Sequence, residues 1–168
     1  MINFEFKVSF SKFQIQAKSA WFQLFMIRNL PSAWFSGVRL IDLEEDHAVV
    51  SVPYKWFSKN PFRSTYFACQ AMAAEMSTGI LAMAHLHESN PPVSMLVTKL
   101  EGEFKKKAVE RVYFTCDDGH AIREAIEKTK RTGEAVSLVT KSIGKSREGT
   151  EISRFTVVWG FKARIKST

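Results

Sequence analysis

The chain has 168 residues, 45% of them hydrophobic and 24% charged, which excludes an intrinsically disordered protein and leaves room for one domain, 1–168. The formal net charge of +7 is compatible with an anionic partner, whether cofactor phosphates, nucleic acid or a membrane surface, although many basic proteins are merely soluble. Cys69 and Cys116 form no CxxC pair, which argues against a disulfide framework or zinc site. Glu5, Lys7 and Lys12 interrupt every early apolar stretch, so we expect no signal peptide and a cytoplasmic location.

The N-terminal part predicts one amphipathic helix followed by two strands. We expect the helix over 11–29, as an extension of the domain, ended by Pro31 because proline cannot continue the helical ladder. Its apolar stripe consists of Phe13, Ala17, Trp21, Leu24 and Phe25. Two extended segments follow at 36–43 and 47–54, and the second alternates with the period of a strand.

A long apolar helix is predicted over 64–86, because strong helix formers dominate and Glu75 is the only formally charged residue in the segment. A helix that is apolar on all sides is either buried or crosses a membrane. A carboxylate at the middle makes crossing costly, so we expect the helix to be buried and no stable membrane insertion.

The C-terminal half predicts strands at 93–106, 109–116, 134–143 and 151–166. A short amphipathic helix is expected between the second and third of them, with Asp118 as its N-cap and Gly133 as its left-handed C-terminal cap. In the last strand one face is apolar and the other polar. The apolar face is formed by Phe155, Val157, Trp159, Phe161, Ala163 and Ile165. The order of elements indicates an α+β domain in which a curved antiparallel sheet wraps round one long central helix.

This arrangement resembles the hotdog fold, and the similarity sharpens at 60–75. Small acyl-CoA thioesterases of the phenylacetyl-CoA type have the motif N-x-x-G-x-x-H-G-G, with an Asp seven residues beyond the second Gly. In that register Asn60 matches the Asn, Tyr66 stands at the His and Glu75 at the catalytic Asp. The opening phrase at 30–37 also looks like an uncharacterised, thioesterase-related branch of the superfamily.

The resemblance implies catalytic roles for Glu75 and Asn60 and a site between two subunits of a homodimer or a dimer of dimers. Substrate contacts are expected from the helix start and from a basic run. These residues are Arg63, Tyr66, Phe67, Ala68, Lys105, Lys106 and Lys107. The sequence departs from the motif, because Arg63 replaces a Gly, Phe67 and Ala68 replace the Gly-Gly pair, and Tyr66 lacks the basicity of a His.

Each candidate also has a structural interpretation. Glu75 could be a structural carboxylate that meets a backbone amide or a subunit boundary. The lysine run, with Lys99 and Arg111 nearby, could be a solvated strand edge rather than a clamp for coenzyme A phosphates. The aromatic N-terminal helix could pack on the sheet, cover an acyl chain, or lie on a membrane surface.

The leading hypothesis is therefore a thioesterase that hydrolyses a fatty-acyl or aryl thioester of coenzyme A, with no metal or other cofactor. The first alternative is a hotdog protein that binds acyl-CoA or lipid without cleaving it. The second, a basic nucleic-acid-binding module, lacks the aromatic and glycine signature of an RNA-recognition strand. His85 and His87, expected to face solvent, are weak as a metal site, and Gly144-Lys145-Ser146 is predicted to be a hairpin turn rather than a phosphate loop.

Overall fold

The computed structural model describes residues 2–164, with side chains from residue 9 onward. It contains five α-helices in that range. They are α1 (Ile2–Ala17), α2 (Ala20–Asn29), α3 (Pro31–Phe35), α4 (Phe67–Leu86) and α5 (Gly119–Thr132). One 3-10 turn, η1 (Trp56–Ser58), and six strands complete the described fold. The strands are β1 (Arg39–Leu43), β2 (Ala48–Val52), β3 (Val93–Phe104), β4 (Val112–Cys116), β5 (Val136–Lys145) and β6 (Glu151–Ala163).

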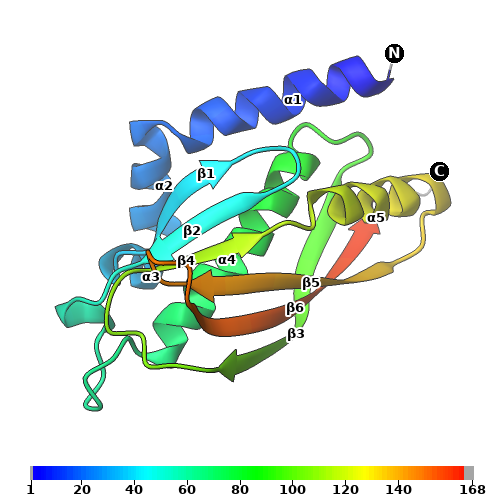
Figure 1. The fold of residues 1–168 in the computed structure, drawn as a ribbon. Coiled ribbons are helices and arrows are strands. Elements are labelled where there is room, and N and C mark those ends of the chain that lie inside the picture. Colours follow the sequence, from blue (N-terminus) through cyan, green and yellow to red (C-terminus); the bar gives the residue numbers. More distant parts are fainter. Residues whose placement is uncertain (1, 165–168) are drawn as a thin grey trace.

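The six strands form one antiparallel sheet in the order β1-β2-β4-β5-β6-β3, which curves round α4 (Figure 1). The expected α+β architecture, a sheet wrapped round a long central helix, is therefore confirmed. The inward face of β6 is apolar as predicted, and its buried members are Phe155, Val157, Trp159, Phe161 and Ala163. The prediction for Ile165 lies outside the described residues.

Helix α4 packs against the sheet through small and apolar side chains, because a helix enclosed by a curved sheet has little space beside its backbone. Gly79 shows the constraint directly: a Cβ there would lie 3.2 Å from the Trp159 ring. The buried hydroxyl of Ser77 pairs with the hydroxyl of Ser142 at 2.8 Å, and the Trp159 indole donates to Thr78 Oγ1 at 2.9 Å. Among residues 2–164 no helix is long and apolar enough to cross a membrane.

The N-terminal extension differs from the single helix expected over 11–29. It begins earlier, at Ile2, and breaks at residues 18–19 into α1 and α2, which meet at an angle (Figure 1). Ser19 has extended backbone angles and its hydroxyl donates to Gln16 O at 2.6 Å. A serine that bonds the backbone locally competes with helical hydrogen bonding, which explains the break.

Other boundaries agree to within a few residues, and α5 ends as expected at Gly133, whose φ of 72° is left-handed. Asp118, expected to cap α5, makes no side-chain cap bond. Its carboxylate instead accepts the Lys141 amide at 2.7 Å and so joins the start of α5 to β5.

Strand β3 is a free edge of the sheet and, with twelve residues, much the longer of the two edges. A bulge between Val97 and Lys99 changes which side chains point inward. Leu100 and Phe104 therefore face the same side as the buried residues of β6, yet both are substantially exposed. Such an edge presents unpaired backbone groups and apolar side chains to a partner strand.

His85 was expected to face solvent, and that expectation is wrong. It is 4% exposed, its ring is tilted against that of Phe10 with centroids 5.1 Å apart, and its Nε2 lies 2.9 Å from Glu45 O. The last turn of α4 is covered by α1, a contact that sequence periodicity did not reveal. Burial lowers the pKa of His85 to about 4, and the nearby charge of Arg123 acts in the same direction.

We expect His85 to make the protein acid-sensitive. A histidine whose folded pKa lies below its unfolded value of 6.5 stabilises the fold above pH 6.5, and that stability is lost as pH falls toward 4. In urea unfolding, the free energy of unfolding should fall by roughly 3 kcal/mol between pH 7.5 and pH 4.5 in the wild type. The fall should be smaller in His85→Gln. Equal losses in the two proteins would contradict this assignment, and His120→Gln, on an exposed side chain, is the control.

Candidate functional site

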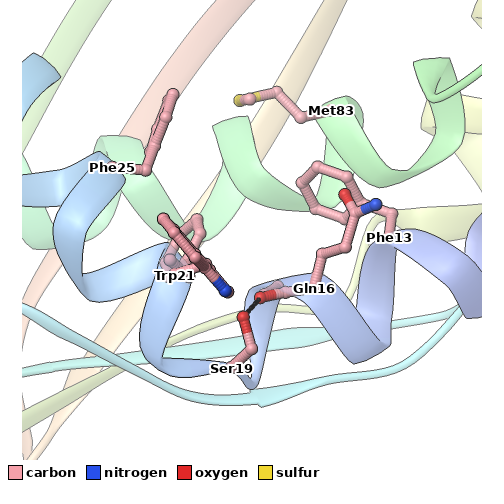
Figure 2. A pocket seen from close by; sticks show the side chains of 8 residues that line it. Phe13, Gln16, Ser19, Trp21, Phe25 and Met83 are labelled. Carbon is pink, nitrogen blue, oxygen red and sulfur yellow. Dashed lines mark hydrogen bonds between the residues drawn. The ribbon is translucent and has the colours of Figure 1, made fainter.

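Three of the hollows along α4 contain residues that the sequence singled out. The helix-start cavity, about 560 Å³, lies at its N-terminus. Its lining consists of Asn60, Pro61, Phe62, Ser64, Thr65, Tyr66, Phe67, Gln70, Phe104, Lys105, Lys106, Lys107 and Ala108. The carboxylate pocket, about 200 Å³, is lined by residues 29–33 together with Met72, Glu75 and Met76. The aromatic pocket, about 450 Å³, lies between α1, α2 and Met83 (Figure 2).

The helix-start cavity brings together most of the predicted substrate-binding residues. Asn60, Tyr66, Phe67 and the lysines at 105–107 all line it, although they come from two loops far apart in sequence. The loops are joined by a backbone bond from the Thr65 amide to Ala108 O at 2.7 Å. Arg63 and Ala68 do not line this cavity.

Backbone donors at the start of α4 are available to a ligand. The first amides of a helix have no intrahelical acceptor, and no side chain caps this one. The Cys69 and Gln70 amides reach Tyr66 O at 3.0 and 3.2 Å, whereas the Phe67 and Ala68 amides have no acceptor among the described residues. Together with the helix dipole, these amides can polarise a carbonyl or hold an anion.

Two buried polar side chains in this cavity were missed as site residues. Thr65 is 2% exposed and its hydroxyl has no hydrogen-bond partner within the described chain. Gln70 is buried as well, and its amide is fixed by a bond to Thr65 O at 3.2 Å and one from the Ser153 hydroxyl at 2.8 Å. A buried hydroxyl without a partner is costly, so Thr65 is a natural contact for a ligand. A polar residue in an otherwise apolar helix was the signal for Gln70.

Asn60 has a structural role within its own loop. Its Oδ1 accepts from the Phe62 amide, the Ser64 amide and the Ser64 hydroxyl at 3.0, 3.3 and 3.2 Å. These bonds close a tight turn that includes Arg63 in a left-handed conformation, with φ of 57°. Asn60 therefore shapes the wall of the cavity and in this protomer does not approach Glu75.

The three lysines differ in their partners. Lys105 pairs with Glu151 at 2.8 Å, and Lys107 approaches Phe62 O at 3.5 Å. Lys106 has no ion-pair partner among residues 9–164. Lys99 pairs with Glu101, and Arg111 bonds to Ser51 Oγ at 2.9 Å, so neither belongs to this cavity.

Glu75 lies apart from the helix-start cavity. It is eight residues beyond Phe67, about 12 Å along the helix, and its carboxylate lines the pocket formed with residues 29–33. That carboxylate makes no hydrogen bond or ion pair within the described chain, and burial alone raises its pKa. The two predicted catalytic residues, Asn60 and Glu75, are therefore not brought together within one protomer.

The aromatic pocket is where the predicted apolar stripe of the N-terminal helix gathers. Figure 2 shows Phe13, Trp21, Phe25 and Met83 around one space, with the polar side chains of Gln16 and Ser19 at its rim. Trp21 is 78% exposed, so the stripe packs on α4 only in part. The pocket could accept an apolar chain.

A cysteine nucleophile and a metal centre find little support in the described chain. Cys69 and Cys116 are both buried and free, and burial raises the pKa of the Cys116 thiol to about 12. Between residues 9 and 164 no group of three His, Cys, Asp or Glu side chains is arranged to hold a metal ion.

No family model and no curated protein matches the chain. Solved structures do match. A protein of unknown function from Pseudomonas aeruginosa, described as a probable thioesterase, superposes with a TM-score of 0.73 at 14% identity over 87% of this chain and 97% of its own. The chain has the hotdog fold.

Two further matches support this fold. A thioesterase from Haemophilus influenzae superposes with a TM-score of 0.63 at 10% identity, over 86% of this chain and 90% of its own. A mutant thioesterase from Pseudomonas aeruginosa gives 0.64 at 11% identity, over 87% and 95%. The hotdog resemblance stated from residues 60–75 is thereby confirmed at the level of the fold.

The carboxylate pocket generates a prediction about stability. Because the folded pKa of Glu75 is raised, its stabilising effect is present below the ordinary value of 4.5 and is lost as pH rises. Glu75→Gln should therefore raise the Tm at pH 8, on the order of a few degrees, and leave it unchanged near pH 4.

Glu151→Gln is a control of opposite sign. Lys105 and Arg154 lower the pKa of Glu151, so its loss should destabilise the protein above the ordinary pKa. Thermal unfolding of both variants across pH 4–8 tests the pair. A Glu75→Gln protein that is less stable at pH 8 would show that the carboxylate is structural.

Proposed function

We propose that the protein is an acyl-CoA thioesterase that hydrolyses a fatty-acyl or aryl thioester. The observation that carries the proposal is the start of α4, where the Phe67 and Ala68 amides and the Thr65 hydroxyl are without partners beside a lysine run. An apolar cavity with a few unsatisfied donors is the common form of a small-molecule site. The thioesterases among the matching structures support the same class of chemistry.

In this proposal the thioester carbonyl lies against the two free amides, where developing negative charge on its oxygen is stabilised by fixed donors and the helix dipole. The lysines at 105–107 lie at the cavity wall and suit the phosphates of coenzyme A. The tail of the substrate would lie along apolar surface such as Phe104, which contacts Phe67 edge to face.

Glu75 is the proposed catalytic carboxylate. As a general base it would take a proton from water; the oxygen attacks the carbonyl carbon, the C–S bond breaks, and the thiolate leaves and is protonated. As a nucleophile it would first form an acyl anhydride that water then hydrolyses. Both routes release a carboxylic acid and the thiol of coenzyme A. A raised pKa, caused here by burial, favours a base that works near neutral pH.

The separation of Glu75 from the helix-start cavity is consistent with a site shared by two subunits, as the hotdog resemblance implies. We propose a homodimer in which β3 pairs edge to edge with β3 of a second copy. The exposed twelve-residue edge and the apolar Leu100 and Phe104 beside it support that pairing. A carboxylate from one copy would then act on a thioester bound at the helix start of the other.

A non-catalytic acyl-CoA or lipid carrier is the second candidate. It is favoured by Phe67 and Ala68, whose side chains occupy positions that are glycines in the thioesterase motif, where substrate approaches the backbone. The aromatic pocket would suit such a carrier, because it offers apolar volume without a reactive group.

The decisive experiment compares wild type with Glu75→Gln on a panel of acyl-CoAs, with released thiol as the signal. We expect the variant to fold, to keep the oligomeric state of wild type in light scattering, and to bind acyl-CoA, but to lose hydrolysis by on the order of 10²-fold or more. Equal turnover would refute the catalytic role of Glu75. Binding without turnover in the wild type would establish the carrier.

The lysine run should contribute to binding of coenzyme A. Lys106→Gln/Lys107→Gln is expected to weaken competition by free coenzyme A on the order of tenfold, with less salt dependence than wild type. Lys141→Gln/Lys162→Gln makes the same change of charge on the outer face of the sheet and should leave competition by free coenzyme A unaltered. Competition assays at low and high salt test both. Equal effects of the two pairs would mean that the lysines contribute only net charge.

A further inference from the structure

The segment between β2 and α4 projects beyond the end of the sheet (Figure 1). Within it, the projecting loop, residues 55–63, carries three large apolar side chains in solvent. Trp56, Phe57 and Phe62 are 72%, 60% and 74% exposed. Soluble surfaces bear single exposed apolar residues, but three aromatic rings on one protruding loop indicate an interaction surface.

The same loop is strongly basic. Lys55, Lys59 and Arg63 are exposed, and none has an ion-pair partner among residues 9–164. Several lysines elsewhere are neutralised, as in the pairs of Lys12 with Glu88 and Lys130 with Glu127. No Asp or Glu occurs from residue 47 to residue 74, so no acidic residue of this segment compensates the positive charge of the loop.

The loop is held in shape rather than loosely exposed. Asn60 Oδ1 bonds the Phe62 and Ser64 amides, and Lys59 forms a β-bridge with Thr65. Trp56 and Phe57 pack edge to face with ring centroids 4.8 Å apart, and Phe57 contacts Phe35 of α3 at 5.9 Å. Rings that are already ordered lose little conformational entropy when they bind.

We propose that the projecting loop docks the protein on an anionic phospholipid surface, with Trp56, Phe57 and Phe62 at the depth of the headgroups and Lys55, Lys59 and Arg63 against their phosphates. Aromatic side chains favour the membrane–water interface, and each basic residue near an anionic leaflet adds attraction. This docking is peripheral, and it does not depend on whether the protein hydrolyses thioesters.

A second copy of the chain fits this surface poorly. Two-fold pairing places the same patch on both subunits, so the six cations of two loops would face one another without acidic groups from either loop. Coenzyme A also fails to explain the surface, because Trp56 and Phe57 do not line the helix-start cavity. Phe62 and Asn60 do line it, so a docked loop would bring the cavity close to the bilayer, where long acyl chains partition.

The test is co-sedimentation of the full chain with vesicles of phosphatidylglycerol and phosphatidylcholine, compared with phosphatidylcholine alone. Wild type should bind the anionic vesicles and release them at about 0.5 M salt, where exposed charges are screened. Lys55→Gln/Lys59→Gln should weaken binding about 25-fold, since each basic residue contributes about fivefold. Trp56→Ser/Phe57→Ser should weaken binding at least tenfold, and more so at high salt.

Two matched variants locate the surface. Lys141→Gln/Lys162→Gln removes the same charge from the outer face of the sheet, and Trp21→Ser removes an equally exposed ring from α2. Both should bind like wild type, and thermal unfolding should show that all variants are folded. Equal losses in control and loop variants, or no binding to anionic vesicles, would overturn the proposal.

Two other outcomes would assign the loop to a different partner and also overturn the proposal. Conversion of an oligomer to a monomer by Trp56→Ser/Phe57→Ser, measured by light scattering without lipid, would make the loop a subunit contact. The other outcome is that single-stranded or duplex nucleic acid binds more tightly than vesicles at physiological salt. If that binding is lost in Lys55→Gln/Lys59→Gln, the loop is a nucleic-acid surface. Competition of free coenzyme A with acyl-CoA is measured separately. If vesicle binding fails while this competition persists, the membrane proposal fails and the thioester site does not.

Discussion

The enclosure of α4 by the curved sheet is the constraint on which the rest of the structure depends. A helix that contacts five strands can carry only side chains that fit a close-packed interior or find an internal partner. Gly79 fits because a Cβ would meet Trp159, and Ser77 fits because its hydroxyl pairs with the hydroxyl of Ser142. Glu75 is two residues from Ser77, about 200° round the helix, so it lies on a different face, beside Gly79, where it lines the pocket near α3.

The same enclosure creates the candidate site at the start of the helix. Because α4 begins where the sheet ends, its first amides emerge at the rim rather than within the core, and no side chain caps them. The loops on either side supply what the helix lacks, namely lysines from 105–107 and a rigid turn closed by Asn60. Fixed donors in a partly apolar cavity are worth more than the same groups in water.

The charge of the protein is unevenly distributed, and this distribution has functional meaning. Many cations of the helices and β3 are matched by nearby carboxylates, so they add little to the field. The helix start and the projecting loop carry Lys55, Lys59 and Lys106 without an ion-pair partner among residues 9–164, and the outer face of the sheet likewise carries Lys141 and Lys162. An anionic ligand and an anionic surface would thus be attracted to the same end of the molecule.

The order of elements, the enclosed helix and the dry face of β6 followed from the sequence, because period and composition report how each segment is buried. The break at Ser19 and the burial of His85 did not, since both depend on contacts between segments distant in sequence. The apolar composition of the helix singled out Glu75 as a lone carboxylate, but its separation from Asn60 could not be read from the motif spacing. Thr65 became a site residue only in the tertiary structure. Its loop is bonded to Ala108, far away in sequence, and its hydroxyl is buried without a hydrogen-bond partner within the described chain, which spacing in the sequence does not reveal.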